Sequence, residues 1–395
     1  MAAIFSFLLS LLAMFPVGAT STTTIGVTYD PSSSNLPPPE HVVKTLRCRH
    51  IQAVRIVNPT PAAIRAFSYS DISLLLTVPN HLVPSFAANS SDASLWLYNN
   101  VLPFYPRSKI SAISVGNDVI SSPTTSDPSN ILVLAIRNVH DALLELGLKS
   151  ISVSTTFSFI NIMARSFPPS SAEFQMPTFD VIIKPLLQFL QETNSSFMVT
   201  VYPYSIYRLQ PEIPIGYAAF REDPFNFRDD IITGVRYRNL FDMMVDGVIA
   251  ALAINGHDTL PVIVAETGWP SSGGSEGISS GALPAETEAG MAYAEMYLKG
   301  LISHLKTGLG TPLRKEGLAG VYIYQLFDEE DLQSRNSSST KQCWGILFRN
   351  MTTKYKIDEF SVSETGSDCN GGSRTLKMDS MLFLLVIAST LLLLV

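Results

Sequence analysis

The sequence is most informative where it reads VIVAETGWPS, residues 262–271. Four apolar residues lead directly into Glu266, and Trp269 and Pro270 follow within the next four positions. An apolar, β-branched run that ends in a carboxylate is typical of a buried strand that carries a charged group to its end. We interpret the stretch as such a strand, with a carboxylate beside an aromatic ring.

Two interpretations fit Glu266 on this evidence. Carbohydrate chemistry needs a carboxylate for the anomeric carbon and a flat apolar face for the sugar ring. A glutamate at the end of a strand also serves to cap the helix that follows. The stretch does not decide between them, so the rest of the chain has to.

Seven further apolar runs resemble this one, at 25–29, 51–57, 73–78, 110–115, 151–155, 198–202 and 319–326. Most are continuously apolar, as expected for strands that are covered on both faces. Helical patterns fall between them, at 131–146, 240–254 and 285–305. Eight strands alternating with helices predict one α/β domain, a (β/α)8 TIM barrel, and the family resemblance given below implies the same fold. An open doubly wound sheet is the alternative, but no Gly-rich phosphate loop follows the first run.

In a barrel of this kind the chemistry lies at the C-terminal ends of the strands. The predicted ends carry carboxylates and aromatic rings, namely Tyr29-Asp30, Asn117-Asp118, Tyr202-Pro203-Tyr204, Glu266 with Trp269, and Phe327-Asp328-Glu329. Random placement would distribute such residues over both ends, so we expect an active site at this rim.

Both ends of the chain carry segments that we expect to be removed. Residues 1–19 are typical of a secretory signal peptide, with an apolar stretch and a small-residue cleavage pattern. The uncharged segment 381–395 is short for a membrane span and follows a polar spacer and small residues. This pattern predicts a GPI anchor at Asn370 and removal of 371–395, with a tail-anchored helix as the alternative.

The mature chain would then consist of a barrel domain over 20–360 and a short polar tail over 361–370, anchored in the outer leaflet of the plasma membrane and facing the cell wall. Four Asn-x-Ser/Thr sequons agree with secretion: Asn89, Asn194, Asn336 and Asn350. The three cysteines are too few for a disulfide framework, and the sequence leaves the pairing of Cys48, Cys343 and Cys369 open.

Charge and composition exclude several classes of function. The net charge of −7 and the lack of a basic run argue against a nucleic-acid partner. No cysteine and histidine cluster has metal-ligand spacing, so we expect neither a metal nor a cofactor. A mildly acidic cleft is better suited to a neutral polymer.

Five ordered strings resemble plant endo-β-1,3-glucanases of glycoside hydrolase family 17: GVTY (26–29), SVGND (114–118), VYPY (201–204), AETGWPS (265–271) and LFDE (326–329). The resemblance covers residues 24–358. It implies a (β/α)8 barrel, a retaining mechanism and linear β-1,3-glucan of the callose type as substrate. We also expect a monomer, without the carbohydrate-binding module that some relatives carry after the barrel.

The resemblance assigns roles to individual residues. Glu266 matches the nucleophile, and Asp118 stands where the family has a glutamate as acid/base. Asn117 is expected to hydrogen-bond the sugar 2-hydroxyl. The remaining matches are to residues that bind substrate: Tyr29, Tyr202, Phe327 and Glu329. Trp269 would either stack on a sugar or support Glu266 from behind.

An aspartate at the acid position changes the expected mechanism. Retaining enzymes hold their two carboxyls roughly 5–5.5 Å apart. Asp118 is one methylene shorter than glutamate, so its carboxyl retreats by about 1.5 Å and the gap opens toward roughly 6.5 Å. General acid catalysis is worth about 10²–10⁴-fold, so the loss would be large.

Three outcomes follow. The loop shifts and Asp118 serves with reduced or altered activity; the cleft binds glucan but hydrolyses it poorly; or another carboxylate such as Glu329 or Glu330 takes over, or the stereochemical outcome inverts. The sequence therefore predicts a secreted, GPI-anchored hydrolase of β-1,3-glucan. A cell-wall glucan-binding protein and a transglycosylase are the alternatives.

Overall fold

The eight apolar runs form the strands of one closed parallel barrel, which confirms the (β/α)8 prediction. The computed structural model describes residues 23–121, 128–272, 289–328 and 343–357. The barrel strands are β1 (Thr24–Tyr29), β2 (Ala53–Val57), β3 (Ser73–Val78), β4 (Lys109–Asn117), β5 (Ser152–Ser158), β8 (Phe197–Thr200), β11 (Val262–Thr267) and β12 (Gly320–Ile323). Pairing of β1 with β12 closes the ring.

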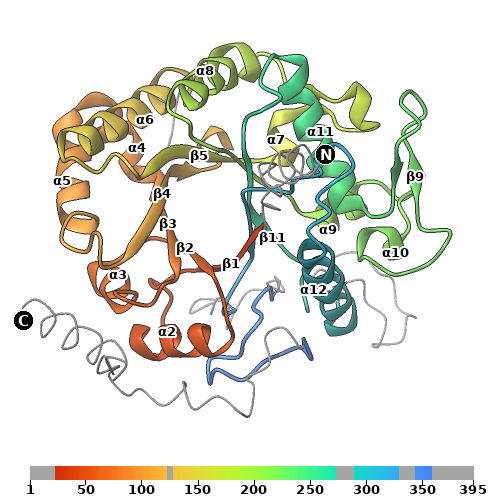
Figure 1. Cartoon of the computed structure of the whole chain (residues 1–395), viewed down its shortest axis with the longest axis horizontal. Coiled ribbons are helices and arrows are strands. Elements are labelled where there is room, and N and C mark those ends of the chain that lie inside the picture. The colour runs from red at the N-terminus through yellow and green to blue at the C-terminus, as the bar shows by residue number, and fades with distance from the viewer. Residues whose placement is uncertain (1–22, 122–127, 273–288, 329–342, 358–395) are drawn as a thin grey trace, which may run out of the picture. The chain divides into compact units, whose positions relative to one another are not determined.

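A ring of helices covers the outside of the barrel, as Figure 1 shows. The main ones are α2 (Pro39–Cys48), α3 (Pro61–Ala66), α4 (Val83–Ala88), α5 (Ser90–Asn100), α6 (Pro128–Glu145), α8 (Lys184–Glu192), α11 (Leu240–Ile254) and α12 (Met291–Lys306). Helix α11 has the predicted bounds, whereas α12 begins at Met291 rather than at residue 285. Among the described residues, no helix has the length and apolar character needed to cross a membrane.

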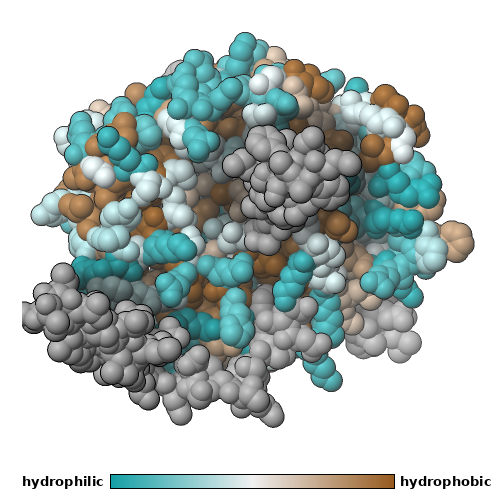
Figure 2. Space-filling model, viewed as in Figure 1, coloured by the Kyte–Doolittle hydropathy of each residue, from teal (hydrophilic) through white to brown (hydrophobic). Residues whose placement is uncertain are grey.

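Shorter elements lie in the connections between the barrel strands. They are the helices α7 (Phe159–Ile162), α9 (Pro203–Leu209) and α10 (Ile215–Ala218), the strands β6 (Met163–Arg165), β7 (Glu173–Phe174), β9 (Arg228–Asp229) and β10 (Arg236–Tyr237), and the turns η1 (Asn80–Leu82), η2 (Val119–Ser121), η3 (Pro169–Ser171) and η4 (Phe179–Ile183). The β9–β10 hairpin projects from the barrel (Figure 1). Ile231 and Ile232 at its tip are exposed, and Figure 2 shows apolar side chains at that edge of the molecule.

Alternating side chains build two separate hydrophobic cores. One small cluster takes a residue from each of six strands, and it fills the inside of the barrel: Ala53, Leu75, Ala112, Met198, Ala265 and Tyr322. The large cluster joins the other strand faces to the helices. In β11, Ala265 belongs to the inner cluster while Val262 and Val264 belong to the outer one, so strict alternation would send Glu266 outward.

Irregularities in the sheet reverse that direction at two strand ends. The register of β11 shifts between Val264 and Glu266 against β8, and that of β4 shifts between Ser114 and Asn117 against β5. An extra residue at a strand end turns the following side chain to the other face, and such bulges are common beside active sites. Both Glu266 and Asn117 thereby face the inside of the barrel mouth.

Strand β12 ends at Ile323, three residues earlier than the prediction of 319–326. Beyond this point the chain pairs with the segment around Trp344, because the Gln325 N–H donates to the Trp344 carbonyl and the Ile346 N–H donates to the Gln325 carbonyl. Tyr324, rather than Phe327, therefore follows the strand directly, and Trp344 lies beside the barrel mouth.

Candidate active site

Glu266 lies at the C-terminal end of β11 and is 7% exposed. Three side chains from β2, β4 and the segment after β8 hold its carboxylate. Arg55 donates to Oε1 in a buried ion pair, the Asn117 amide donates to Oε1 at 3.3 Å, and the Tyr202 hydroxyl donates to Oε2 at 2.7 Å. A buried carboxylate with hydrogen-bond donors on both oxygens is fixed in one orientation.

Arg55 is a site residue that the sequence reasoning missed. It comes from the middle of β2 and is 0% exposed, and it points into the barrel like its inner-cluster neighbour Ala53. A buried arginine needs a negative partner, and Glu266 provides it. The signal was present in the sequence, because Arg55 is the one charged residue in the apolar run 51–57.

Tyr202 keeps its proton in this environment. Burial, followed by the negative charge of Glu266, raises the pKa of the Tyr202 phenol well above its ordinary value. The hydroxyl therefore acts as a hydrogen-bond donor to Glu266 rather than as a charged group. The structure places Tyr202 in contact with Glu266, and its contact with sugar stays a prediction.

Asn117 is fixed through its main chain by Asn80, at the start of η1. The Asn80 amide donates to the Asn117 carbonyl at 2.9 Å, and its oxygen accepts the Asn117 N–H at 2.8 Å. This pair of bonds places the Asn117 amide toward Glu266. Asn80 was not predicted, since a single asparagine after a strand carries no distinctive pattern.

Asp118 follows at the same strand end, but its carboxyl is held by the neighbouring β5–α7 junction. Oδ1 accepts the Ser158 N–H at 3.1 Å, and Oδ2 accepts the Asn161 amide at 2.6 Å. Each oxygen thus already has an N–H donor. The aspartate does sit beside Asn117 at the predicted mouth, and its role as an acid stays a prediction.

An aromatic group stands next to Glu266, and the sequence reasoning predicted Tyr202 but missed its two other members. Tyr202, Tyr324 and Trp344 are half-buried and meet edge to face, with ring centroids 5.2 to 6.1 Å apart. Aromatic rings that are partly open and close to a carboxylate fit the apolar face of a sugar. Trp344 could not be found from a strand-end pattern, because it lies outside every barrel strand.

Gly268 allows this group to lie so close to Glu266. A Cβ at this position would come within 2.6 Å of the Tyr324 carbonyl oxygen and 3.3 Å of the Trp344 ring. The Glu-Thr-Gly-Trp sequence therefore needs glycine because main chain and indole approach it closely.

Trp269 lies behind the site rather than in it. Its ring is 1% exposed and packs against Tyr204, Tyr207 and Tyr297 at centroid distances of 5.1 to 6.0 Å. Such a ring has no face open to a sugar, so the stacking interpretation of Trp269 is corrected in favour of a support for the β11 end.

Tyr29 and Phe327 meet edge to face at 6.4 Å, and both rings are buried. Burial raises the pKa of Tyr29 to about 12. Their assignment as cleft aromatics stays a prediction. Glu329 lies outside the described residues.

The remaining sequence predictions concern the surface. Three sequon asparagines are exposed, as glycosylation requires: Asn89, Asn194 and Asn350. Asn336 and Asn370 lie outside the described residues. Cys48 is disulfide-bonded and Cys343 is a free thiol, while Cys369 lies outside the described residues.

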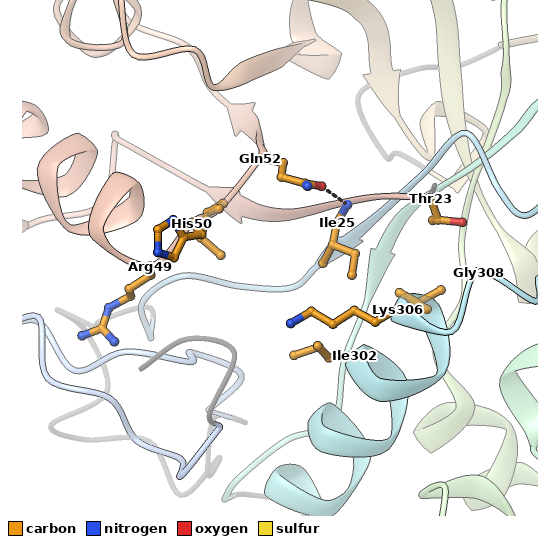
Figure 3. Close-up of a pocket in the computed structure, with 10 residues that line it drawn as sticks. Thr23, Ile25, Arg49, His50, Gln52, Ile302, Lys306 and Gly308 are labelled. Atoms are coloured by element: carbon orange, nitrogen blue, oxygen red, sulfur yellow. Dashed lines mark hydrogen bonds between the residues drawn. The ribbon is translucent and has the colours of Figure 1, made fainter. Parts of the chain in front are cut away.

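A pocket of about 370 Å³ lies at the opposite ends of the strands, where Thr23 and Ile25 flank the first residue of β1 (Figure 3). Its polar lining includes Arg49, Gln52 and Lys306, and no carboxylate is among its lining residues. It therefore lacks the groups for glycosidic chemistry. No group of three or more His, Cys, Asp or Glu side chains within the described ranges is placed to hold a metal.

A protein-family model matches most of the chain. The family model of glycosyl hydrolases family 17 matches residues 25–359. The chain belongs to glycosyl hydrolase family 17. Two solved structures agree: a β-1,3-glucanase and pollen allergen of Cryptomeria japonica, 32% identical with a TM-score of 0.76, covers 86% of this chain and 100% of its own. A structure from work on two plant β-glucan endohydrolases with distinct substrate specificities, also 32% identical, has a TM-score of 0.71 and covers 84% and 99%.

Two curated relatives of this family 17 chain are glucan endo-1,3-beta-glucosidases. Glucan endo-1,3-beta-glucosidase 12 of Arabidopsis thaliana is 36% identical over 90% of this chain, and the match spans 63% of that relative's own length. A glucan endo-1,3-beta-glucosidase of Vitis vinifera is 32% identical over 88% of the chain and 94% of its own length.

Proposed function

We propose that this chain hydrolyses internal β-1,3 linkages of a glucan with retention of configuration, through a covalent intermediate on Glu266. The observation that carries the proposal is the Glu266 carboxylate, held at the barrel mouth by Arg55, Asn117 and Tyr202. The names of the relatives, which are glucan endo-1,3-beta-glucosidases, support β-1,3-glucan as the substrate.

Two steps follow from the proposed roles. Glu266 attacks the anomeric carbon, the bond to the leaving O3 breaks, and Asp118 gives that oxygen a proton. Water then attacks the same carbon, its proton passes to Asp118, and the ester bond to Glu266 breaks. Two inversions at one carbon give net retention.

A second function is favoured by the contacts of Asp118. Its two carboxyl oxygens are bonded to Ser158 and Asn161, and it is a methylene shorter than the glutamate of the family. A chain that keeps the cleft but transfers the proton poorly would act mainly as a β-1,3-glucan-binding protein of the cell wall.

One experiment separates the two functions. Residues 20–370 are produced as a soluble protein, and reducing sugar released from laminarin is measured for the wild type, Asp118→Glu and Glu266→Gln. If the chain is a hydrolase, the wild type releases sugar, Asp118→Glu releases it at least about tenfold faster, and Glu266→Gln releases no sugar. Laminarin binding without any release at high protein concentration would leave only the binding function. Products longer than the substrate would indicate transglycosylation.

We also propose that the mature protein is attached to the outer face of the plasma membrane by a GPI anchor near Asn370. The small residues, spacer and apolar tail of the sequence support this. Release of the protein from cells by a phosphatidylinositol-specific phospholipase is the expected result. Retention with the membrane after that treatment, together with solubility in detergent only, would favour the tail-anchored alternative.

A further inference from the structure

We infer that Asn161 is a positioning residue that ties the Asp118 carboxyl to the β5 side of the barrel mouth and thereby slows proton transfer to the glycosidic oxygen. The inference rests on the proposed function, in which Asp118 is the proton donor. It identifies Asn161 as the side chain that limits the reaction, beyond the shortness of aspartate itself.

The tie is short and is itself anchored. The Asn161 amide nitrogen lies 2.6 Å from Asp118 Oδ2 and 2.8 Å from the Ser121 hydroxyl oxygen, so it joins α7 to the turn η2 that follows β4. The second carboxyl oxygen accepts the Ser158 N–H. Because an amide N–H can only donate, both bonds use acceptor positions of the carboxyl.

The direction of the tie matters for the chemistry. In the barrel, β5 and β8 stand between β4, which carries Asp118, and β11, which carries Glu266. A carboxyl bonded to the end of β5 leans along the rim toward its neighbour strand. A general acid needs an oxygen within about 2.6–3.2 Å of the leaving oxygen, which lies over the mouth.

The main chain does not supply the missing reach, because it is held at Asp118 and two residues before it. Gly116 has a φ of +79°, and a Cβ there would lie 2.2 Å from the Val119 side chain. Asp118 has a φ of +50°, and its N–H donates to the Thr156 carbonyl at 2.8 Å. A non-glycine residue in this region persists only when its surroundings hold it there.

Only rotation of the Asp118 side chain is therefore left to bring the carboxyl over the mouth, and it has to break the bond to Asn161. Hydrogen bonds to charged groups are among the stronger ones, so removing this bond should change the rate by about tenfold. The rate should rise when the bond is removed, because the bond stabilises the state before proton transfer and is absent in the transition state.

The test compares two substrates that differ in their need for an acid. The leaving group of a laminari-oligosaccharide is a sugar alcohol, which needs a proton. The leaving group of a dinitrophenyl β-laminaribioside is a stable phenolate, which departs without one. For Asn161→Ala, kcat/KM should rise about tenfold on the oligosaccharide and stay unchanged on the aryl glycoside. Ser121→Ala removes the other anchor of the amide and should give a smaller gain of the same kind. Asn100→Ala, which removes an amide from α5, is the control and should change neither.

The gain must depend on Asp118. In an Asp118→Asn background, Asn161→Ala should have no effect on either substrate. A fall in kcat/KM on the oligosaccharide, or an equal change on both substrates, would overturn the inference. Thermal melting of each variant shows that it is folded.

Failure of the proposed function gives a different result. A chain that cleaves neither substrate is no hydrolase, and crystals of wild type and Asn161→Ala with bound laminaritriose then decide the inference alone. A carboxyl that leaves Ser158 and turns toward the sugar in the variant supports the tie. One that remains on Ser158 in both crystals overturns it.

Discussion

The two carboxylates of the proposed reaction stand at the ends of β11 and β4 in contrasting environments. Glu266 is buried, and its partners come from three other places in the barrel, Arg55 from the middle of β2, Asn117 from the end of β4 and Tyr202 from just beyond β8. Among the described residues, the Asp118 carboxyl takes its hydrogen-bond donors from Ser158 and Asn161, at the β5–α7 junction. The first environment presents a carboxylate to the centre of the barrel, and the second keeps one at the rim.

This difference matches the different requirements of the two proposed roles, nucleophile for Glu266 and proton donor for Asp118. A nucleophile has to be fixed and negatively charged, which the Glu266 contacts provide. A proton donor has to reach the leaving oxygen, which depends on side-chain length and freedom. The contacts of Glu266 fit the nucleophile of the proposed reaction, and in our proposal the acid end limits the rate.

The largest expected effect separates the two ends directly. Glu266→Gln should lower kcat/KM by at least roughly 10³-fold on both laminarin and an activated aryl glycoside, because the nucleophile is lost for any leaving group. Asp118→Asn should lower it on laminarin alone. Steady-state kinetics on the two substrates measure this.

Glu192→Gln serves as the control, since it removes an exposed carboxylate at the end of α8. If Asp118→Asn lowers both substrates as strongly as Glu266→Gln does, the two ends are not separate and the comparison breaks down.

The next effect concerns the partner of the nucleophile. Arg55→Lys should lower kcat/KM by about 10- to 100-fold on both substrates. Lysine lacks the planar fork of arginine, and the arginine hydrogen bond to the carboxylate is worth about 1.5–3 kcal/mol. Arg65→Lys, an exposed change on α3, should have no effect. A loss confined to laminarin would place Arg55 on the acid side instead.

The sequence predicted the barrel because its strands are continuous apolar runs, which burial on both faces requires. The run 73–78 matches β3 at both ends. The sequence predicted the end of β12 wrongly. The strand ends early because Gln325 is hydrogen-bonded to the segment at Trp344, and residues more than ten positions apart in the chain leave no local signal of such a contact.

The site was predictable where a residue breaks a local pattern. Glu266 ends an apolar run and was found, whereas Arg55 interrupts one and was overlooked. Glu266 points inward because the register of β11 shifts just before it, and the pattern of side chains in the sequence does not predict such a shift. Trp344 and Asn161 reach the site from connections, so only the fold brings them there.

A smaller effect is expected from the third contact of Glu266. Tyr202→Phe removes the hydroxyl donor but keeps the ring that meets Trp344 at 5.2 Å. Loss of one hydrogen bond to a charged acceptor should lower kcat/KM about tenfold on both substrates, with little change in laminarin binding. Tyr98→Phe, at an exposed ring on α5, is the matched control. Weaker laminarin binding with unchanged turnover would assign Tyr202 to the sugar rather than to Glu266.

The smallest effect on activity, none at all, is expected from Asp246, a buried carboxyl in α11 that contacts neither Glu266 nor Asp118. Burial raises its pKa from 3.8 to about 7, and its Oδ2 accepts the Leu313 N–H at 2.9 Å. Between these pH values the folded state binds the proton more tightly than the unfolded chain, so the free energy of unfolding falls as the pH rises through this window. Asp246→Asn removes that dependence. Its melting temperature relative to the wild type should therefore be higher near pH 8 than near pH 4, by roughly 2 °C for each 1 kcal/mol.

The pH profile of kcat/KM on laminarin should not move, because Asp246 belongs to neither end of the site. A profile that shifts with Asp246→Asn would mean that pH acts on activity through the fold, and the contrast between Glu266 and Asp118 would then have to be measured at constant folded fraction.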